Sequence, residues 1–310
     1  MHMRKKFIAI ILCAILVFCF GCNNKNKGDE GKTKIVTSFY PIYVFTINLT
    51  QGIDDVTVQN ITQQTGGCIH NYQLLPKDMV LLSDAALFVT NGSGMETFVS
   101  KVSEQLPNLP VVSSSDGIKL MESQHHPHDD DAQEVPHEHE HEYNAHVWLS
   151  VHNAIIQVEN ISKALKKALP DNTDKIEKNK QEYIKRLTAL DKEIANELKD
   201  YSGTPIMTFH EAYNYFATDY NLLIIATIEN DEGNEPSAKE IAKLSSTIKE
   251  FNVPAIFIEP NYTGSSAKIL ASETGIKVCT LNPITSGNDS LTAYEDIMKS
   301  NLSVIKEALG

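Results

Sequence analysis

Short β-rich runs alternate with amphipathic runs along the chain from Lys34 onward. The β-rich runs predict strands at 35–37, 56–58, 87–89, 111–112, 206–207, 222–228, 255–258 and 277–281. In the first half, helices are expected between them at 42–49, at 76–83 and near 95–105. Because strands that alternate with helices favour parallel sheets built from βαβ units, the pattern predicts an α/β fold.

One long segment, 172–200, has a different pattern. It contains no Gly or Pro, and its apolar residues recur mostly at steps of three and four: Ile176, Ile184, Leu187, Leu190, Ile194 and Leu198. This spacing predicts a long amphipathic helix; a coiled coil would need the pattern to last longer. About 275 folded residues are enough for two domains. We therefore expect two α/β lobes, 34–171 and 201–310, each with a mainly parallel sheet flanked by helices, joined by one long rigid helix.

The N-terminus begins with a basic and apolar segment. Arg4, Lys5 and Lys6 precede an uncharged apolar run over 7–20, which indicates a secretory signal peptide over 1–21. The alternative is a transmembrane helix, but the run has 14 residues and a polar tract follows it. Crossing a hydrocarbon core takes about 20 residues. We therefore expect the mature chain to be extracytoplasmic.

The end of this segment, 19–22, resembles a bacterial lipobox, in which the signal is cut before a cysteine that is then acylated; here Cys19 stands at the usual aliphatic position. Cys22 is the expected lipidation site. The polar segment 22–33 then acts as a flexible tether between lipid and folded domain. The sequence thus predicts a protein anchored by lipid to the outer face of the bacterial cell membrane.

Charge and cysteine content exclude some classes of protein. Removing the three basic residues with the signal changes the formal net charge from -13 to about -16, which argues against nucleic acid as a partner. Of the five cysteines, only Cys68 and Cys279 remain in the folded part if Cys22 carries lipid. The chain therefore lacks the framework of a disulfide-rich domain.

A low-complexity segment, 121–143, interrupts the α/β order. It holds eight acidic residues, no Lys or Arg, and six histidines: His125, His126, His128, His137, His139 and His141. A solvated acidic insertion without a chemical role is one interpretation. The number of histidines favours another, in which this His-rich loop binds metal weakly and raises its local concentration.

Four histidines lie elsewhere in the mature chain: His70, His146, His152 and His210. Three of them, all but His152, lie where a predicted strand end or loop meets a helix, which is where α/β sheets bind ligands. Three neutral imidazoles can form a zinc site with one open position. Sequence distance alone does not show whether they converge.

At these residues the chain resembles the metal-binding lipoproteins of bacterial importers for zinc and manganese. The shared motifs lie at 67–72, 76–78, 91–96, 146–149, 209–213, 215–216 and 235–237, and the resemblance covers nearly all of 34–310. It implies two α/β lobes bridged by one long helix, with the metal in the cleft between them. His70 and His146 would be first-lobe ligands and His210 the second-lobe ligand. Histidine at the last position, like the His-rich loop, is typical of the zinc branch.

The chain departs from the family pattern at two places. Cys68-Ile69 replaces an Asp-Pro pair; Cys68 is either a thiolate ligand or, as we favour, a small buried side chain, and pairing with Cys279 stays open. Asn282 replaces an aspartate ligand, so that the fourth position would be held by Asn282 or a water. Glu211 and Asp289 are weaker candidates. Three imidazoles and a water favour zinc over manganese.

The resemblance predicts a monomeric, non-enzymatic protein that captures Zn²⁺ and delivers it to the permease of an ABC importer and, through it, to the ATPase. Mn²⁺ is the second choice of metal, in a member of the same family with an adhesin-like surface role. A zinc-dependent hydrolase with Glu211 as base is a further alternative, but neither an HExxH nor a GxSxG pattern is present.

Overall fold

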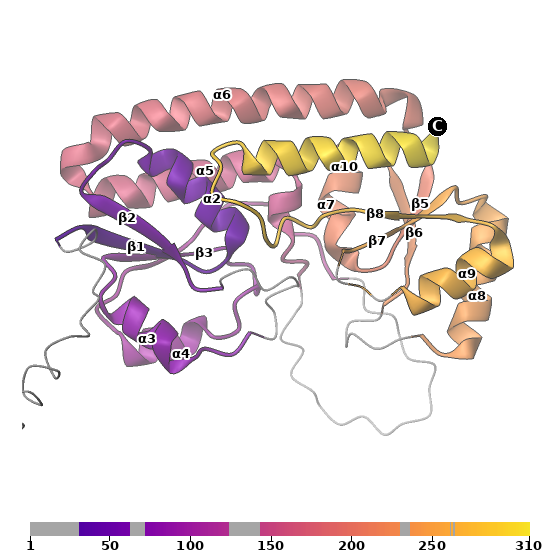
Figure 1. Cartoon of the computed structure of the whole chain (residues 1–310), viewed down its shortest axis with the longest axis horizontal. Helices are drawn as coiled ribbons and strands as arrows, with labels where there is room; N and C mark the ends of the chain where they lie inside the picture. The colour runs from indigo at the N-terminus through magenta and orange to yellow at the C-terminus, as the bar shows by residue number, and fades with distance from the viewer. Residues whose placement is uncertain (1–30, 63–71, 124–142, 230–235, 261, 263) are drawn as a thin grey trace, which may run out of the picture. The chain divides into compact units, whose positions relative to one another are not determined.

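Two four-stranded parallel sheets form the framework of the chain (Figure 1). The computed structural model describes residues 31–62, 72–123, 143–229, 236–260, 262 and 264–310. The strands are Thr33–Thr37 (β1), Val56–Asn60 (β2), Leu87–Thr90 (β3), Val111–Ser113 (β4), Pro205–Thr208 (β5), Leu223–Thr227 (β6), Ala255–Ile258 (β7) and Lys277–Thr280 (β8). Their orders are β2-β1-β3-β4 and β6-β5-β7-β8, so each sheet has the same doubly wound arrangement.

Burial of both faces explains why the central strands are short apolar runs. In β3 all four residues are buried, and Ile35 of β1 lies in register with Val58 on one side and Leu87 on the other. A parallel sheet is covered by helices on both faces, so its inner strands need not alternate with polar residues. The α/β class and the two sheets predicted from the sequence are confirmed.

In the first lobe, the helices form a layer on each face of the sheet. One apolar core joins β1 and β3 to the first layer, Tyr40–Thr50 (α2), Val151–Ala168 (α5) and Thr173–Leu198 (α6). A second core, which includes Val36, Phe88 and Val102, joins the opposite face to Pro76–Ser83 (α3) and Val99–Gln105 (α4).

The second lobe repeats this plan. Met207 and Ile256 pack with Ala238–Phe251 (α8) and Ser265–Thr274 (α9) on one face. Ile206 and Phe257 point to the other face, towards Asn214–Asp219 (α7) and Ala293–Leu309 (α10). Helix α8 begins with a capping box, in which Ser237 and Glu240 satisfy each other's backbone N–H groups.

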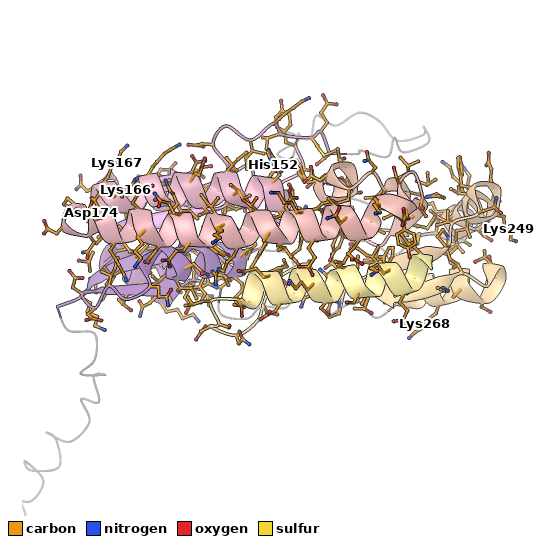
Figure 2. The ribbon with its side chains drawn as sticks, turned by 90° about the horizontal axis from the view of Figure 1, so that it is seen from above. His152, Lys166, Lys167, Asp174, Lys249 and Lys268 are labelled. Atoms are coloured by element: carbon orange, nitrogen blue, oxygen red, sulfur yellow. The ribbon has the colours of Figure 1, made fainter. Side chains whose placement is uncertain are left out.

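Helix α6 is the long helix predicted over 172–200, and its 26 residues extend for about 39 Å. Near its start, Asn179 Nδ2 donates to the carbonyls of Leu49 and Gln51 in the first lobe, both at 2.9 Å. Near its end, α6 lies along α10 (Figure 2), where Lys299 Nζ is 2.8 Å from Glu193 Oε2. One helix therefore contacts both lobes.

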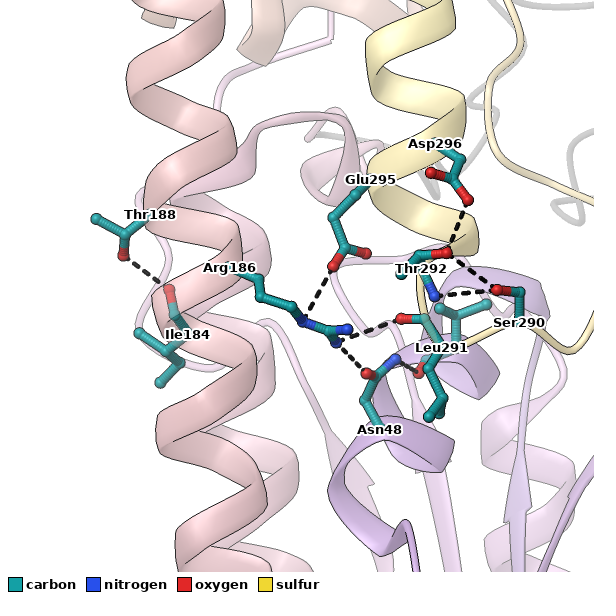
Figure 3. Close-up of polar contacts among 10 residues, drawn as sticks. Asn48, Ile184, Arg186, Thr188, Ser290, Leu291, Thr292, Glu295 and Asp296 are labelled. Carbon is teal, nitrogen blue, oxygen red and sulfur yellow. Dashed lines mark hydrogen bonds and ion pairs between the residues drawn. The ribbon is translucent and has the colours of Figure 1, made fainter.

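Arg186, midway along α6, joins three elements (Figure 3). Its guanidinium donates to Asn48 Oδ1 on α2 and to the carbonyl of Leu291, at 3.3 Å. Its Nε lies 3.3 Å from Glu295 Oε1 on α10. The Glu295 side chain is 9 % exposed, and its burial raises the pKa of the carboxyl. Helix α6 is thus fixed at its centre by an ion pair whose carboxylate side is buried.

The helix expected near 95–105 begins only at Val99. Gly92 and Gly94 before it have positive φ angles, and the buried Glu96 carboxylate accepts the N–H groups of Asn91 and Gly92 at 2.6 and 2.9 Å. A loop closed by these bonds replaces the first turns of the expected helix. Within the described residues, no helix is both long and apolar enough to cross a membrane.

Candidate metal site

His146 lies in the first lobe, in the loop that leads into α5, and is 3 % exposed. Asn144, two residues earlier, holds it in place. The Asn144 Oδ1 atom is 2.9 Å from the backbone N of His146 and 3.0 Å from its Nδ1. The backbone N and the Nδ1 atom of His146 therefore both face Asn144 Oδ1. The Nε2 atom, on the opposite side of the ring, points away from Asn144.

His210 lies in the second lobe, where the chain leaves β5 through Phe209. Its Nδ1 is 3.6 Å from Glu229 Oε2, at the end of β6. The position of Glu229 is set by the sheet, because its N–H donates to the carbonyl of Phe209 at 2.8 Å. Parallel strands end at the same edge, so the carboxylate is brought beside the imidazole by topology and not by sequence proximity.

The two imidazoles face each other across the lobes. Their Nε2 atoms are 3.1 Å apart, and their rings meet edge to face with centroids 4.8 Å apart. Two nitrogens bound to one zinc ion at about 2.0–2.1 Å in tetrahedral geometry are separated by about 3.3–3.4 Å. The spacing therefore suits a zinc ion after a displacement of a few tenths of an ångström.

Glu229, the carboxylate beside His210, has a second carboxyl near it, that of Glu259. The pKa of Glu259, which follows β7, is raised to about 7, first by burial and then by the charge of Glu229. Negative charge beside a ligand imidazole favours a bound cation and strengthens the imidazole as a donor. Glu229 is therefore suited to support a metal ion at the candidate ligand His210.

An aromatic wall borders His146, the candidate ligand of the first lobe. Trp148 is fully buried, its ring centroid is 5.1 Å from that of His146, and the ring of Phe39 meets it edge to face with centroids 4.9 Å apart. The indole N–H donates to the carbonyl of Pro283 in the second lobe at 2.9 Å. The same residue thus shields the imidazole from water and joins the two lobes.

Several of the predicted site residues lie outside the part of the chain that the structure describes. The predicted ligands His70 and Cys68 and the six histidines of the His-rich loop lie outside the described residues, as does the predicted lipidation site Cys22. Over 31–62, 72–123, 143–229, 236–260, 262 and 264–310, no three His, Cys, Asp or Glu side chains form a group that could hold a metal ion. The structure therefore brings His146 and His210 together, while the third predicted ligand stays a prediction.

The candidates for the fourth position have other partners. Asn282 Oδ1 accepts the N–H of Ile284 at 2.8 Å, and Glu211 Oε1 accepts from the Ser123 hydroxyl at 3.1 Å. Asp289 lies beside Tyr40 and Tyr43 and contributes, after burial, to raising both tyrosine pKa values to about 12. An Asn282 carbonyl has a second lone pair, so its role as a ligand remains a prediction.

Cys279 and His152 also lie within the described residues. Cys279 lies in β8 as a free, partly buried thiol whose pKa is raised by burial. His152 is exposed on the first turn of α5 (Figure 2).

Sequence reasoning missed two residues beside the candidate ligands, Asn144 and Glu229, and the carboxyl of Glu259 near Glu229. The spacing of Asn144 from His146, an amide side chain two residues before a candidate ligand, was a usable signal. The two glutamates had a weaker one, since each directly follows a β-rich run near the strand end where ligands bind.

Comparison with known proteins gives the family of the chain. The family model described as "Zinc-uptake complex component A periplasmic" matches residues 35–308. The chain is 35% identical over 310 residues to the high-affinity zinc uptake system protein ZnuA of Bacillus subtilis, covering 97% of this chain and 96% of that protein. It is 33% identical to the zinc-binding lipoprotein AdcA of Streptococcus pneumoniae, of which it spans only 61%.

Solved structures agree with these matches. The metal-dependent lipoprotein YcdH of Bacillus subtilis is similar with a TM-score of 0.74 at 33% identity, covering 90% of this chain and all of that one. Zn(II)-bound AdcA from Streptococcus pneumoniae also has a TM-score of 0.74, at 31% identity, with 90% of this chain and 58% of that chain covered. The chain belongs to the family of zinc-uptake component A proteins.

Proposed function

We propose that the chain captures zinc outside the cytoplasm and delivers it to an ABC importer. The observation that carries this proposal is the 3.1 Å approach of the Nε2 atoms of His146 and His210, one from each lobe. His70 supplies the third imidazole, and Asn282 or a water the fourth position. The names of the relatives, a zinc uptake system protein and zinc-binding lipoproteins, support zinc as the cargo.

A competition titration of zinc and manganese against the full chain tests the ligand set. His70→Ala, His146→Ala and His210→Ala should each weaken tight zinc binding strongly, because each removes one nitrogen donor. His152→Ala is the matched control, since His152 is exposed on α5. Manganese binding tighter than zinc, or zinc binding indifferent to His210, would refute the site.

The His-rich loop binds further zinc weakly and raises its concentration near the tight site. Deletion of 124–142, with a short glycine-serine linker in its place, tests this role and keeps Glu122 and Tyr143, which form a bridge at the base of the loop. The deletion should remove the weak zinc sites and leave one tight site. Loss of the tight site would contradict this division of roles.

Zinc affinity should fall as the pH drops below about 6.5, because a ligand imidazole must be neutral and its ordinary pKa is near that value. The measurement is the zinc dissociation constant between pH 5 and 8. The double variant His146→Ala/His210→Ala should lose most of this dependence, since two of the three protons that compete with zinc are then absent.

The permease of the importer, and through it the ATPase, receives the zinc from a monomeric chain. Cys22 carries the lipid that holds the protein to the outer face of the membrane. Cys22→Ser should release the protein from the membrane fraction while leaving its zinc affinity unchanged. Zinc uptake by cells should fall in this variant, since the local concentration of the protein beside the permease is lost.

A further inference from the structure

The side-chain amide of Asn144 contacts both lobes. Its Nδ2 donates to the backbone carbonyl of Glu211 at 2.7 Å, next to His210, and its Oδ1 faces Nδ1 of His146 at 3.0 Å. The side chain is 1 % exposed. It therefore spans the short gap between the segments that carry the two candidate ligands.

These contacts determine the orientation of the amide. A carbonyl oxygen only accepts hydrogen bonds, so the end of Asn144 that faces Glu211 must be the NH₂ group. The opposite end is then the oxygen, which also accepts the backbone N–H of His146 at 2.9 Å. Two independent partners thus agree on one orientation.

The orientation of the Asn144 amide also determines the tautomer of His146. Since Asn144 Oδ1 is an acceptor, the neutral imidazole must carry its proton on Nδ1. The lone pair is then on Nε2, the atom 3.1 Å from Nε2 of His210. The imidazole is held in the protonation state and the direction that a metal ion requires.

The backbone of Asn144 is held as firmly as its side chain. Its N–H donates to the carbonyl of Met121 at 2.8 Å, and its carbonyl accepts from the Tyr215 hydroxyl at 2.7 Å. The same hydroxyl accepts the N–H of Met121 at 3.0 Å. The stem of the His-rich loop is therefore fixed against α7, and Asn144 extends from that fixed stem towards both ligands.

We propose that Asn144 is a positioning residue for zinc binding, which sets the tautomer of His146 and fixes its distance from His210. It does not contact the metal. The proposal rests on the proposed function, since it assigns a support role at the same site. Outer-shell partners of metal-binding histidines typically change metal affinity by about 10- to 100-fold, and this is the effect expected here.

Four variants of the full chain in a mild detergent separate the contributions. Asn144→Ala removes both side-chain contacts. Asn144→Asp keeps the acceptor for Nδ1 but lacks the donor to Glu211. Tyr215→Phe is the matched control, because it removes bonds to the same stem and leaves the amide of Asn144 intact. His146→Ala reports on the site itself.

The first readout is the tautomer of His146 in the metal-free protein, from the ¹⁵N resonances of its ring. We expect the Nδ1–H form in the wild type, in Asn144→Asp and in Tyr215→Phe, and a mixture of tautomers in Asn144→Ala. A purely structural role for Asn144 would not move this signal. The Nε2–H form in the wild type would overturn the proposal.

The second readout is zinc affinity by competition titration. Asn144→Ala should bind zinc about 10- to 100-fold more weakly, and Asn144→Asp and Tyr215→Phe less than about 10-fold more weakly. Equal losses in Asn144→Ala and Tyr215→Phe would overturn the positioning role. A separate result would refute the proposed function: His146→Ala binding zinc as tightly as the wild type.

Discussion

Replacing Arg186 by methionine removes the positive partner of Glu295 and tests whether α6 is fixed by an ion pair. The Glu295 side chain is 9 % exposed and that of Arg186 39 % exposed. Removing one partner of a buried pair costs about 3–5 kcal/mol, whereas exposed pairs contribute about 0.2–1 kcal/mol. Because solvent reaches the arginine, we expect the free energy of unfolding to fall by about 2–3 kcal/mol.

The loss of stability in Arg186→Met should depend on pH. Burial raises the pKa of Glu295, and the charge of Arg186 opposes that rise. In Arg186→Met the pKa rises further, so the folded state takes up a proton as the pH falls while the unfolded state stays ionised down to about pH 4.3. The difference in stability between wild type and variant should therefore be largest at pH 7.5 and should shrink towards pH 4.5.

Urea unfolding of the metal-free protein at these two pH values is the assay. Arg186→Met/Glu295→Gln should recover at least half of the loss at pH 7.5, because the uncompensated charge is gone while the bonds of Arg186 to Asn48 and Leu291 remain broken. A loss below about 0.5 kcal/mol in the single variant, or one that is equal at both pH values, would refute the role assigned to the pair.

Three further predictions concern residues around the site. Glu259→Gln should raise the free energy of unfolding by about 1–2 kcal/mol at pH 8 and change it little at pH 4. The reason is that the buried carboxyl, whose pKa is about 7, ionises as the pH rises through 7, and this charge destabilises the folded wild type. Thermal unfolding at both pH values measures the difference. Zinc should change the fluorescence of Trp148, the chain's one tryptophan, whose ring is 5.1 Å from His146, and the change should vanish in His146→Ala but persist in His152→Ala. Gly92→Ala should lower the free energy of unfolding by about 1–3 kcal/mol or more. The φ angle of Gly92 is +83°, and the added Cβ would lie 2.0 Å from Ser113 Oγ. An unchanged urea midpoint would contradict this.

Patterns that depend on local chemistry were predictable from the sequence alone. The short apolar runs predicted the strands to within a few residues, because inner strands of a parallel sheet are buried on both faces wherever they lie. The spacing of Ile176, Leu187 and Ile194 predicted α6, because all three lie on the buried side of that helix. Motif similarity indicated the family, and His146 and His210 were selected through it.

Distances between segments far apart in the chain were decided only by the tertiary structure. The separation of 64 positions in sequence between His146 and His210 does not predict the 3.1 Å approach of their Nε2 atoms. The helix expected from Met95 was shortened because the Glu96 carboxylate binds the preceding loop. Glu229 and Asn144 could be placed beside the candidate ligands only once strand order and lobe contacts were known. Periodicity is a property of neighbours in sequence, whereas a metal site is a property of neighbours in space.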